Sequence, residues 1–277
     1  MQKFLIAILF LTISFVSQAF DRQDFIDSCI NVYKDGTKSY QIAKNEFGLT
    51  GEKADVIAYV IQNMVTNKFF LNYTYNKLVQ QGFNLSQIKD KNELLNVVSN
   101  ACISTFYTVM YRGLTRLSPE EHRFAFEYSL NTLKYLKARR EYGLCRLQGL
   151  GANTKISIKE LTRASKMIYK DVSVSYLRKY ADLILKSFNA ETIDFPRKKR
   201  LTAEEVIEID SIYQNLLIER LQRMSQSDIE RIIYAFSDLQ GANAKDSCDA
   251  VILTLEAALD AKGDIGDKIL LYILMED

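Results

Sequence analysis

Histidine and tryptophan are almost missing from this chain, which has one histidine, His122, and no tryptophan among its 277 residues. A Ser-His-Asp triad would have to use that single histidine, and no G-x-S-x-G, H-E-x-x-H, Walker or dinucleotide-binding motif is present. Zinc sites need clustered Cys or His ligands, whereas no two cysteines are close in sequence. We therefore predict no catalytic, metal or cofactor-binding residue. His122 itself is expected to be an exposed side chain at a helix start.

Proline and glycine are also scarce, with 2 and 11 copies, while helix-start patterns are frequent. Ser118–Glu121, Thr202–Glu205 and Ser227–Glu230 fit the capping box, in which the first and fourth residues bind each other's exposed backbone amides. Glycines after apolar segments, such as Gly113, mark expected helix ends. Apolar side chains recur with the helical period, as in Cys248, Val251, Ile252, Leu255 and Leu259. These patterns predict an all-α, multi-helix bundle.

One segment conflicts with this prediction, because the polar and apolar residues of Leu71–Asn76 alternate as in a β-strand. No partner strand is evident elsewhere in the chain. We therefore interpret this segment as a helix as well.

Long apolar runs are missing everywhere except at the beginning. Lys3 is followed by the apolar run 4–15, and the small residues Ser17 and Ala19 then precede a plausible cleavage point. This order is typical of a secretory signal peptide, here residues 1–19, with an uncleaved membrane anchor as the alternative. We expect a periplasmic or secreted protein without stable membrane insertion after cleavage.

Cysteine is limited to four copies, at Cys29, Cys102, Cys145 and Cys248. An even number in an oxidising compartment favours two disulfides, and four cysteines allow three pairings. Because short closures are commoner than interleaved ones, we favour Cys29–Cys102 together with Cys145–Cys248.

Net charge is the last scarce property, since removal of residues 1–19 leaves 35 basic and 34 acidic residues. We therefore expect no nucleic-acid partner. Residues 20–277 are predicted to form a single helical domain, with 189–201 as the place where it would be subdivided. That segment contains a run of four basic residues, either a solvated loop or a contact for an acidic partner or membrane surface. The run supplies the candidate partner-binding residues Arg197, Lys198, Lys199 and Arg200.

The missing catalytic equipment favours a non-enzymatic, disulfide-braced scaffold that binds another protein. The narrower hypothesis is an inhibitor or immunity-type protein directed against a toxin or a cell-wall enzyme. One alternative is an enzyme that cleaves cell-wall glycan or peptide with Glu204, Glu205 or Glu208 as its acid. Another is a carrier of lipid or a similar apolar ligand. The 16 tyrosines and 15 phenylalanines fit either a core or a binding surface.

Overall fold

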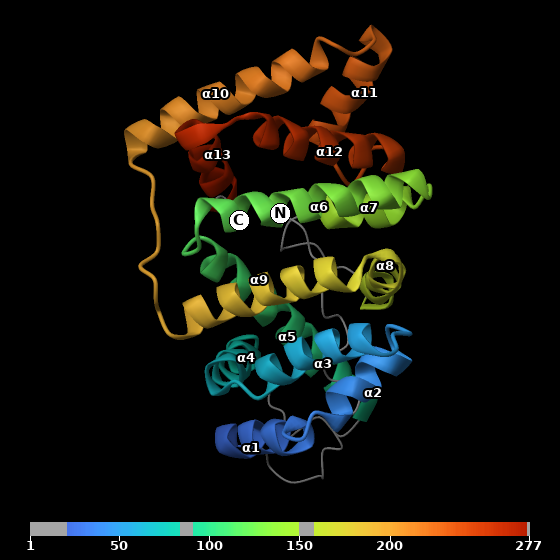
Figure 1. Cartoon of the computed structure of the whole chain (residues 1–277), viewed down its shortest axis with the longest axis vertical. Coiled ribbons are helices and arrows are strands. Elements are labelled where there is room, and N and C mark those ends of the chain that lie inside the picture. Colours follow the sequence, from blue (N-terminus) through green and yellow to red (C-terminus); the bar gives the residue numbers. More distant parts are fainter. Residues whose placement is uncertain (1–20, 84–90, 150–157, 276–277) are drawn as a thin grey trace. The chain divides into compact units, whose positions relative to one another are not determined.

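The computed structural model describes residues 21–83, 91–149 and 158–275. These residues form thirteen helices and no strand, which confirms the all-α prediction (Figure 1). Within them, no helix combines the length and apolar character needed to cross a bilayer. The predicted signal peptide, residues 1–19, lies outside the described residues.

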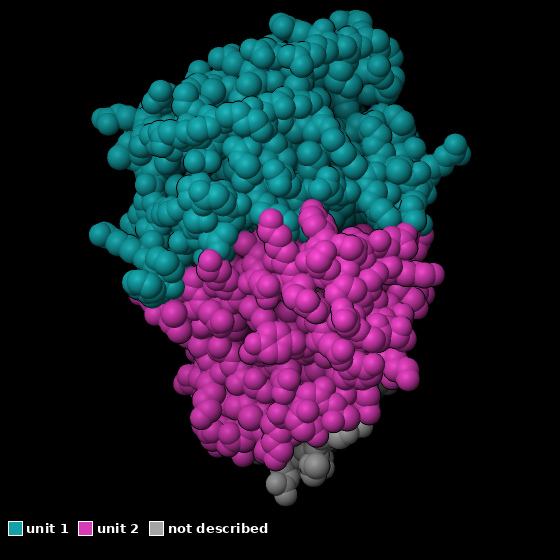
Figure 2. All heavy atoms as spheres, viewed as in Figure 1, with its two compact units in different colours: residues 1–4, 114–156, 195–277 teal, residues 5–113, 157–194 magenta. Residues whose placement is uncertain are grey.

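The chain divides into two compact units, coloured separately in Figure 2. Unit 1 contains the described residues of Leu114–Ile156 and Phe195–Asp277, and unit 2 contains those before Leu114 together with Ser157–Asp194. The boundary between Asp194 and Phe195 falls inside the segment 189–201. Whether the whole chain behaves as a single domain stays a prediction.

Unit 2 is built around helix α3, which packs against α2, α4, α9 and α1. Its core is rich in aromatic side chains: ring centroids lie 5.6 Å apart for Phe70 and Phe188, and 5.6 Å apart for Phe47 and Tyr169. Its helices are α1 Arg22–Tyr33, α2 Thr37–Asn45, α3 Glu52–Val65, α4 Lys68–Gln80, α5 Lys91–Leu114 (whose last residue belongs to unit 1), α8 Ile158–Asp171 and α9 Val174–Thr192. The alternating segment Leu71–Asn76 lies inside α4, so its interpretation as a helix is confirmed.

Gly113 does not end a helix as predicted but lies within the last turn of α5. A Cβ atom on this residue would meet the backbone oxygen of Ser187, in α9, at 1.7 Å. The glycine is therefore required by the close approach of two helix backbones, a role that its sequence context does not reveal.

Unit 1 is built around helix α12, which packs against α6, α7, α10, α11 and α13. Its helices are α6 Pro119–Ala138, α7 Tyr142–Gly149, α10 Ala203–Leu221, α11 Gln226–Ser237, α12 Ala244–Asp260 and α13 Gly263–Met275. Eight α12 side chains are buried: Ser247, Cys248, Ala250, Ile252, Leu253, Leu255, Ala257 and Ala258. Burial of this apolar area is the main force that holds the unit together.

Helix starts in unit 1 follow the capping chemistry expected from the sequence. Complete capping boxes open α6 at Ser118 and α10 at Thr202, as predicted. Helix α11 begins two residues earlier than predicted, because the Oγ of Ser225 accepts the backbone N–H of Asp228 at 3.2 Å. Ser227 is therefore already inside that helix.

The disulfide predictions had different outcomes. Cys145 of α7 and Cys248 of α12 are joined, with their Cα atoms 5.3 Å apart, as predicted. Cys29 and Cys102 are instead buried free thiols, so the second predicted bridge is absent from the structure. The pairing rule weighs only separation along the chain, whereas a bond also needs specific backbone geometry. Burial raises the pKa of Cys29 to about 12, which keeps this thiol protonated.

Candidate partner-binding surface

Helices α10 and α11 follow one another in unit 1, joined by residues 222–225, and we use the name hairpin for this pair of consecutive helices (Figure 1). Helix α10 has nineteen residues but buries only Ile209 and Tyr213. Helix α11 likewise buries only Ile232 and Ala235. Most of the surface of this hairpin is therefore available to solvent.

Large apolar side chains occupy that available surface. Ile207 and Ile218 are exposed on α10, and they are eleven residues apart, which places them on the same side of the helix. We use the name hairpin face for the exposed apolar side chains near the C-terminal end of α10 and on α11, namely Ile218, Ile233, Tyr234 and Phe236. A concentration of such side chains on two neighbouring helices is typical of a binding surface.

The hairpin is held in place by packing against the rest of unit 1. Beneath α11, Leu221, Met224 and Leu239 cover a small buried cluster, whose members are Ile232, Ala235, Ala242, Ala250 and Leu253. Helix α10 is attached to α12 by Tyr213, whose hydroxyl donates to the carbonyl oxygen of Thr254 at 3.2 Å. These contacts give the exposed side chains a defined support.

A half-buried arginine, Arg220, fixes the C-terminal end of α10. Arg220 donates from Nη1 to Glu256 Oε2 at 2.6 Å, and its Nη2 lies 2.7 Å from Asp260 Oδ2. Both acidic partners belong to α12. Because a guanidinium that binds two carboxylates has little rotational freedom, this contact fixes α10 against α12 near Ile218.

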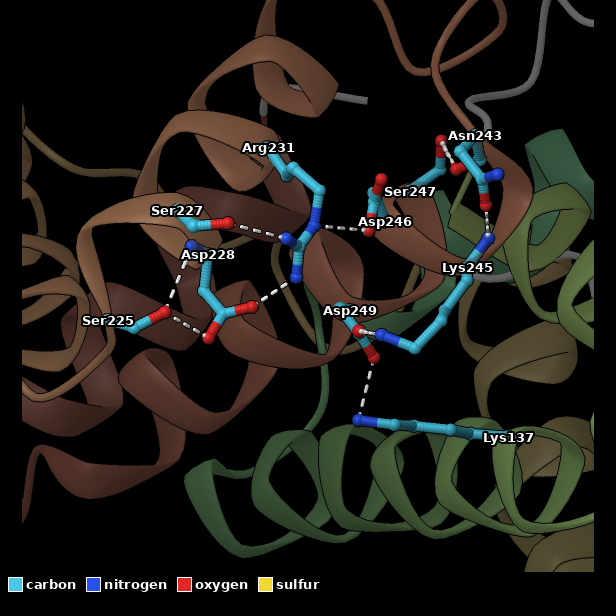
Figure 3. Close-up of polar contacts among 10 residues, drawn as sticks. All are labelled: Lys137, Ser225, Ser227, Asp228, Arg231, Asn243, Lys245, Asp246, Ser247 and Asp249. Carbon is cyan, nitrogen blue, oxygen red and sulfur yellow. Dashed lines mark hydrogen bonds and ion pairs between the residues drawn. The ribbon is translucent and has the colours of Figure 1, made fainter.

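Charged side chains form a network along α11 and α12 (Figure 3). Arg231 contacts Asp228 on its own helix and Asp246 on α12, the latter at 3.3 Å. Asp249 lies between two lysines, at 2.6 Å from Lys137 Nζ and 2.9 Å from Lys245 Nζ. A hydrogen bond from Ser225, followed by the charge of Arg231, lowers the pKa of Asp228. The network therefore balances its own charges next to the exposed apolar residues of α11, as in the polar rim of an interface.

The predicted basic residues lie in the extended segment that precedes α10. The segment is attached to unit 1 by two hydrogen bonds, from Arg116 Nη1 to the carbonyl oxygen of Pro196 at 2.9 Å and from the Lys199 N–H to that of Thr115 at 3.3 Å. Arg197 and Arg200 are exposed, and the side chains of Lys198 and Lys199 are partly exposed. Their role in partner binding stays a prediction.

The three glutamates of the enzyme hypothesis have different environments. Glu205 accepts the backbone N–H of Thr202 at 2.8 Å and pairs with Lys268 at 3.1 Å, and the Thr202 hydrogen bond is the main cause that lowers its pKa. A general acid needs a raised pKa, so Glu205 has the opposite character. Glu204 and Glu208 are exposed on α10. Their surroundings are those of ordinary helix-surface residues.

His122 is buried, contrary to the prediction of an exposed side chain, with 1% of its surface accessible. Its Nε2 lies 2.7 Å from the carbonyl oxygen of Leu114, to which it donates a hydrogen bond. Burial is the main cause that lowers its pKa, so the ring is neutral near pH 7. The sequence shows the acidic neighbours of His122 but not its contact with the carbonyl oxygen of Leu114 or its burial in the fold.

Two surface pockets are found in unit 2. One, of about 490 Å³, is lined by Asp21, Arg22, Gln23, Ile26, Lys68 and Asn72. The other, of about 540 Å³, is lined by Gly48, Leu49, Thr50, Glu52, Lys53, Lys170 and Val174. Both are open and carry charged side chains, which does not match an apolar ligand. Among the described residues, no group of three or more Cys, His, Asp or Glu side chains could hold a metal ion.

The hairpin face was missed from the sequence, although a signal for it was present. Apolar residues occur on several sides of α10, as in Val206, Ile207, Ile209, Ile212, Leu216, Leu217 and Ile218. A surface helix normally confines its apolar residues to one stripe. A helix that is apolar on several sides needs additional cover, and α12 and α13 provide it on only part of α10.

Comparison of the chain with protein-family models, with curated proteins and with solved structures gave no match.

Proposed function

We propose that this chain is an exported, non-enzymatic helical protein that binds another protein through the hairpin face. The observation that carries the proposal is the exposure of Ile218, Ile233, Tyr234 and Phe236 on two neighbouring helices. Water contact with this apolar area is unfavourable, and its removal by a partner would stabilise a complex.

The surroundings of the hairpin face support this proposal. Tyrosine and phenylalanine are enriched at interface centres, while charged residues are enriched at the rim. Here the Arg231 and Asp249 ion-pair network lies along α11 and α12, so α11 carries both charges of the network and apolar side chains of the hairpin face (Figure 3). The α12 core beneath holds the backbone in place, so little ordering would oppose association.

The two alternative functions have weaker physical support. The lowered pKa of Glu205 opposes a role as a proton donor, and both described pockets have charged linings unsuited to an apolar ligand. Export is proposed from the character of residues 1–19 and agrees with the Cys145–Cys248 disulfide, since such bonds persist in oxidising compartments. In the narrower version of the proposal, the partner is a toxin or a cell-wall enzyme that the chain inhibits.

The test is affinity capture from envelope and secreted fractions of the source cells, using the disulfide-intact chain. The informative variant is I233S/F236S, which removes two exposed apolar side chains of α11. The matched control is Y59S, because Tyr59 is an exposed aromatic residue on α3, in the other unit. Binding of the captured protein is then measured with both proteins purified.

We expect one protein, bound in a fixed ratio, to be retained by the wild type and by Y59S. We expect I233S/F236S to raise the dissociation constant by about 30-fold or more, since hot-spot truncation costs ~2 kcal/mol or more. Equal binding by all three proteins would exclude the hairpin face. Failure of every form to retain a protein would exclude the proposed function. Activity of the partner with and without this chain then tests the inhibitor version.

A further inference from the structure

The N-terminal end of α10 and the segment before it carry unpaired charges of both signs. The cations of Arg197, Lys198 and Arg200 precede the helix, and the carboxylates of Glu204 and Glu208 lie in its first turns. Within the described part of the chain, these five side chains make no hydrogen bond or ion pair. Two other charges on α10 are paired, Glu205 with Lys268 and Arg220 with Glu256. Five unpaired charges of both signs thus lie together in one stretch, residues 197–208.

Two exposed apolar side chains accompany these charges. Phe195 is 68% exposed and Ile207 is 73% exposed. Glu204, Ile207 and Glu208 follow the spacing of residues on one helix face, so Ile207 is flanked by the two carboxylates. We call the residues from Phe195 to Glu208 the near-end surface. It has a basic half with an aromatic residue and an acidic half with an aliphatic residue.

The backbone of the near-end surface is fixed by unit 1. Arg116 binds the Pro196 carbonyl, and the Lys199 N–H binds the Thr115 carbonyl. The capping box at Thr202 then sets the direction of α10. The two oppositely charged halves are therefore presented together on one fixed support.

We propose that the near-end surface binds a second copy of this chain across a twofold axis. In such an interface the same patch is used by both copies, so the basic half of one contacts the acidic half of the other, twice. Contacts of Arg197, Lys198 and Arg200 with Glu204 and Glu208 would pair both free carboxylates of each copy and leave one cation of each copy in water. The exposed side chains of Phe195 and Ile207 would be buried in the same interface.

Charge pattern favours a second copy over other occupants. An anionic membrane or an acidic protein would suit the basic half, but it would be repelled by Glu204 and Glu208 in the same surface. A basic partner would be repelled by the other half. A second copy related by a twofold axis supplies both complements.

This proposal goes beyond the binding of a foreign protein and uses a different part of unit 1. Ile207 and Ile218 are separated along α10 by eleven residues, or roughly 16 Å. The near-end surface and the hairpin face are therefore at opposite ends of the helix. One proposal can fail while the other holds, because the first needs no foreign partner.

The test is a charge exchange followed by sedimentation equilibrium of the purified, disulfide-intact chain. The basic variant is R197E/K198E/R200E, and the acidic variant is E204K/E208K. The control K34E/K38E/K44E makes the same net charge change as the basic variant at lysines in and next to α2, in unit 2. Unfolding midpoints of all proteins are measured to show that each is folded.

We expect a dimer for the wild type and the control, weakened by salt because it is held by ion pairs. Each charge variant alone should be monomeric, with the dimer dissociation constant raised by more than about 100-fold, since two like-charged halves would meet. An equimolar mixture of the two folded variants should form a heterodimer, because each then offers the other an opposite charge. A structural defect in either variant would not be repaired by mixing.

Three results would overturn the proposal. They are a monomeric wild type at every accessible concentration, a dimer that both charge variants retain, and a mixture of folded variants that stays monomeric. Vesicles that contain phosphatidylglycerol are added to the wild type in a parallel experiment. Binding of a monomeric wild type to these vesicles, lost in R197E/K198E/R200E, would assign the near-end surface to an anionic membrane instead.

Discussion

Helices α10 and α12 are similar in length, with 19 and 17 residues, but they bury two and eight side chains respectively. Both contain many aliphatic residues. The difference lies in their neighbours, since α12 is packed against five helices of unit 1 and α10 mainly against α12 and α13. The comparison shows that the apolar content of a helix does not by itself determine how many of its side chains are buried. That number depends on how many neighbouring helices pack against it. Helix α10 is only partly packed against its own unit, and its exposed side chains are the basis of the proposed partner binding and of the proposed dimer.

The largest effect is expected from the disulfide that attaches α12 to α7. In C145A/C248A the bridge is lost, and its sequence separation of 103 residues corresponds to about 4.7 kcal/mol of unfolding free energy in the loop-closure model. Denaturant unfolding should show this loss. It should also show that reductant destabilises the wild type but not the variant.

The same experiment tests the thiols of unit 2. Since Cys29 and Cys102 are free in the structure, they should add no sensitivity to reductant. If C145A/C248A is still destabilised by reductant, a bridge between Cys29 and Cys102 must form in solution. C29A/C102A is the control that would remove that remaining effect.

The next effect compares the same substitution in the two helices. Ile252→Ala in α12 removes a buried side chain and should lower the free energy of unfolding by about 3 kcal/mol, through lost burial and a cavity. Ile218→Ala in α10 removes an exposed side chain and should change it by less than about 0.5 kcal/mol. Equal losses would mean that α10 is covered in solution, as it would be in an oligomer that uses this end of the helix.

The smallest effect concerns the start of α10. The Thr202 hydrogen bond and Lys268 hold the pKa of Glu205 below its ordinary value of 4.5. The carboxylate therefore contributes stability that is present above pH 4.5 and is lost as the pH falls through its lower, folded-state pKa. Glu205→Gln should lower the denaturation midpoint near neutral pH, and the difference from wild type should shrink in acid.

Glu219→Gln is the control for this pH experiment, because Glu219 is exposed on the same helix. Its midpoint should follow that of the wild type. A difference between Glu205→Gln and wild type that stays constant with pH would show that the carboxylate charge does not stabilise the helix start.

Local chemistry was the part of this fold that the sequence revealed well. The capping boxes at Ser118 and Thr202 are complete in the structure, because such boxes depend on residues only three positions apart. The segment Leu71–Asn76 was also interpreted correctly, as part of a helix. The favoured pairing of Cys145 with Cys248 is present as well.

Features that depend on distant parts of the chain were not predictable. His122 is buried and lies against the carbonyl oxygen of Leu114, eight residues earlier, and position 113 requires glycine because α9 passes close to it. The free state of Cys29 and Cys102 depends on three-dimensional placement that spacing does not encode. For the candidate site, the sequence identified the basic run but not the hairpin face, because exposure of α10 follows from the number of helices that reach it.

The Cys145–Cys248 bond also has a topological consequence. Between its two cysteines the chain passes through helices α8 and α9, which belong to unit 2. The bond therefore closes a covalent ring that contains segments of both units. A single proteolytic cut anywhere within that ring leaves every fragment attached, and separation requires reduction. In an oxidising compartment, a nicked molecule would keep its full mass and both units.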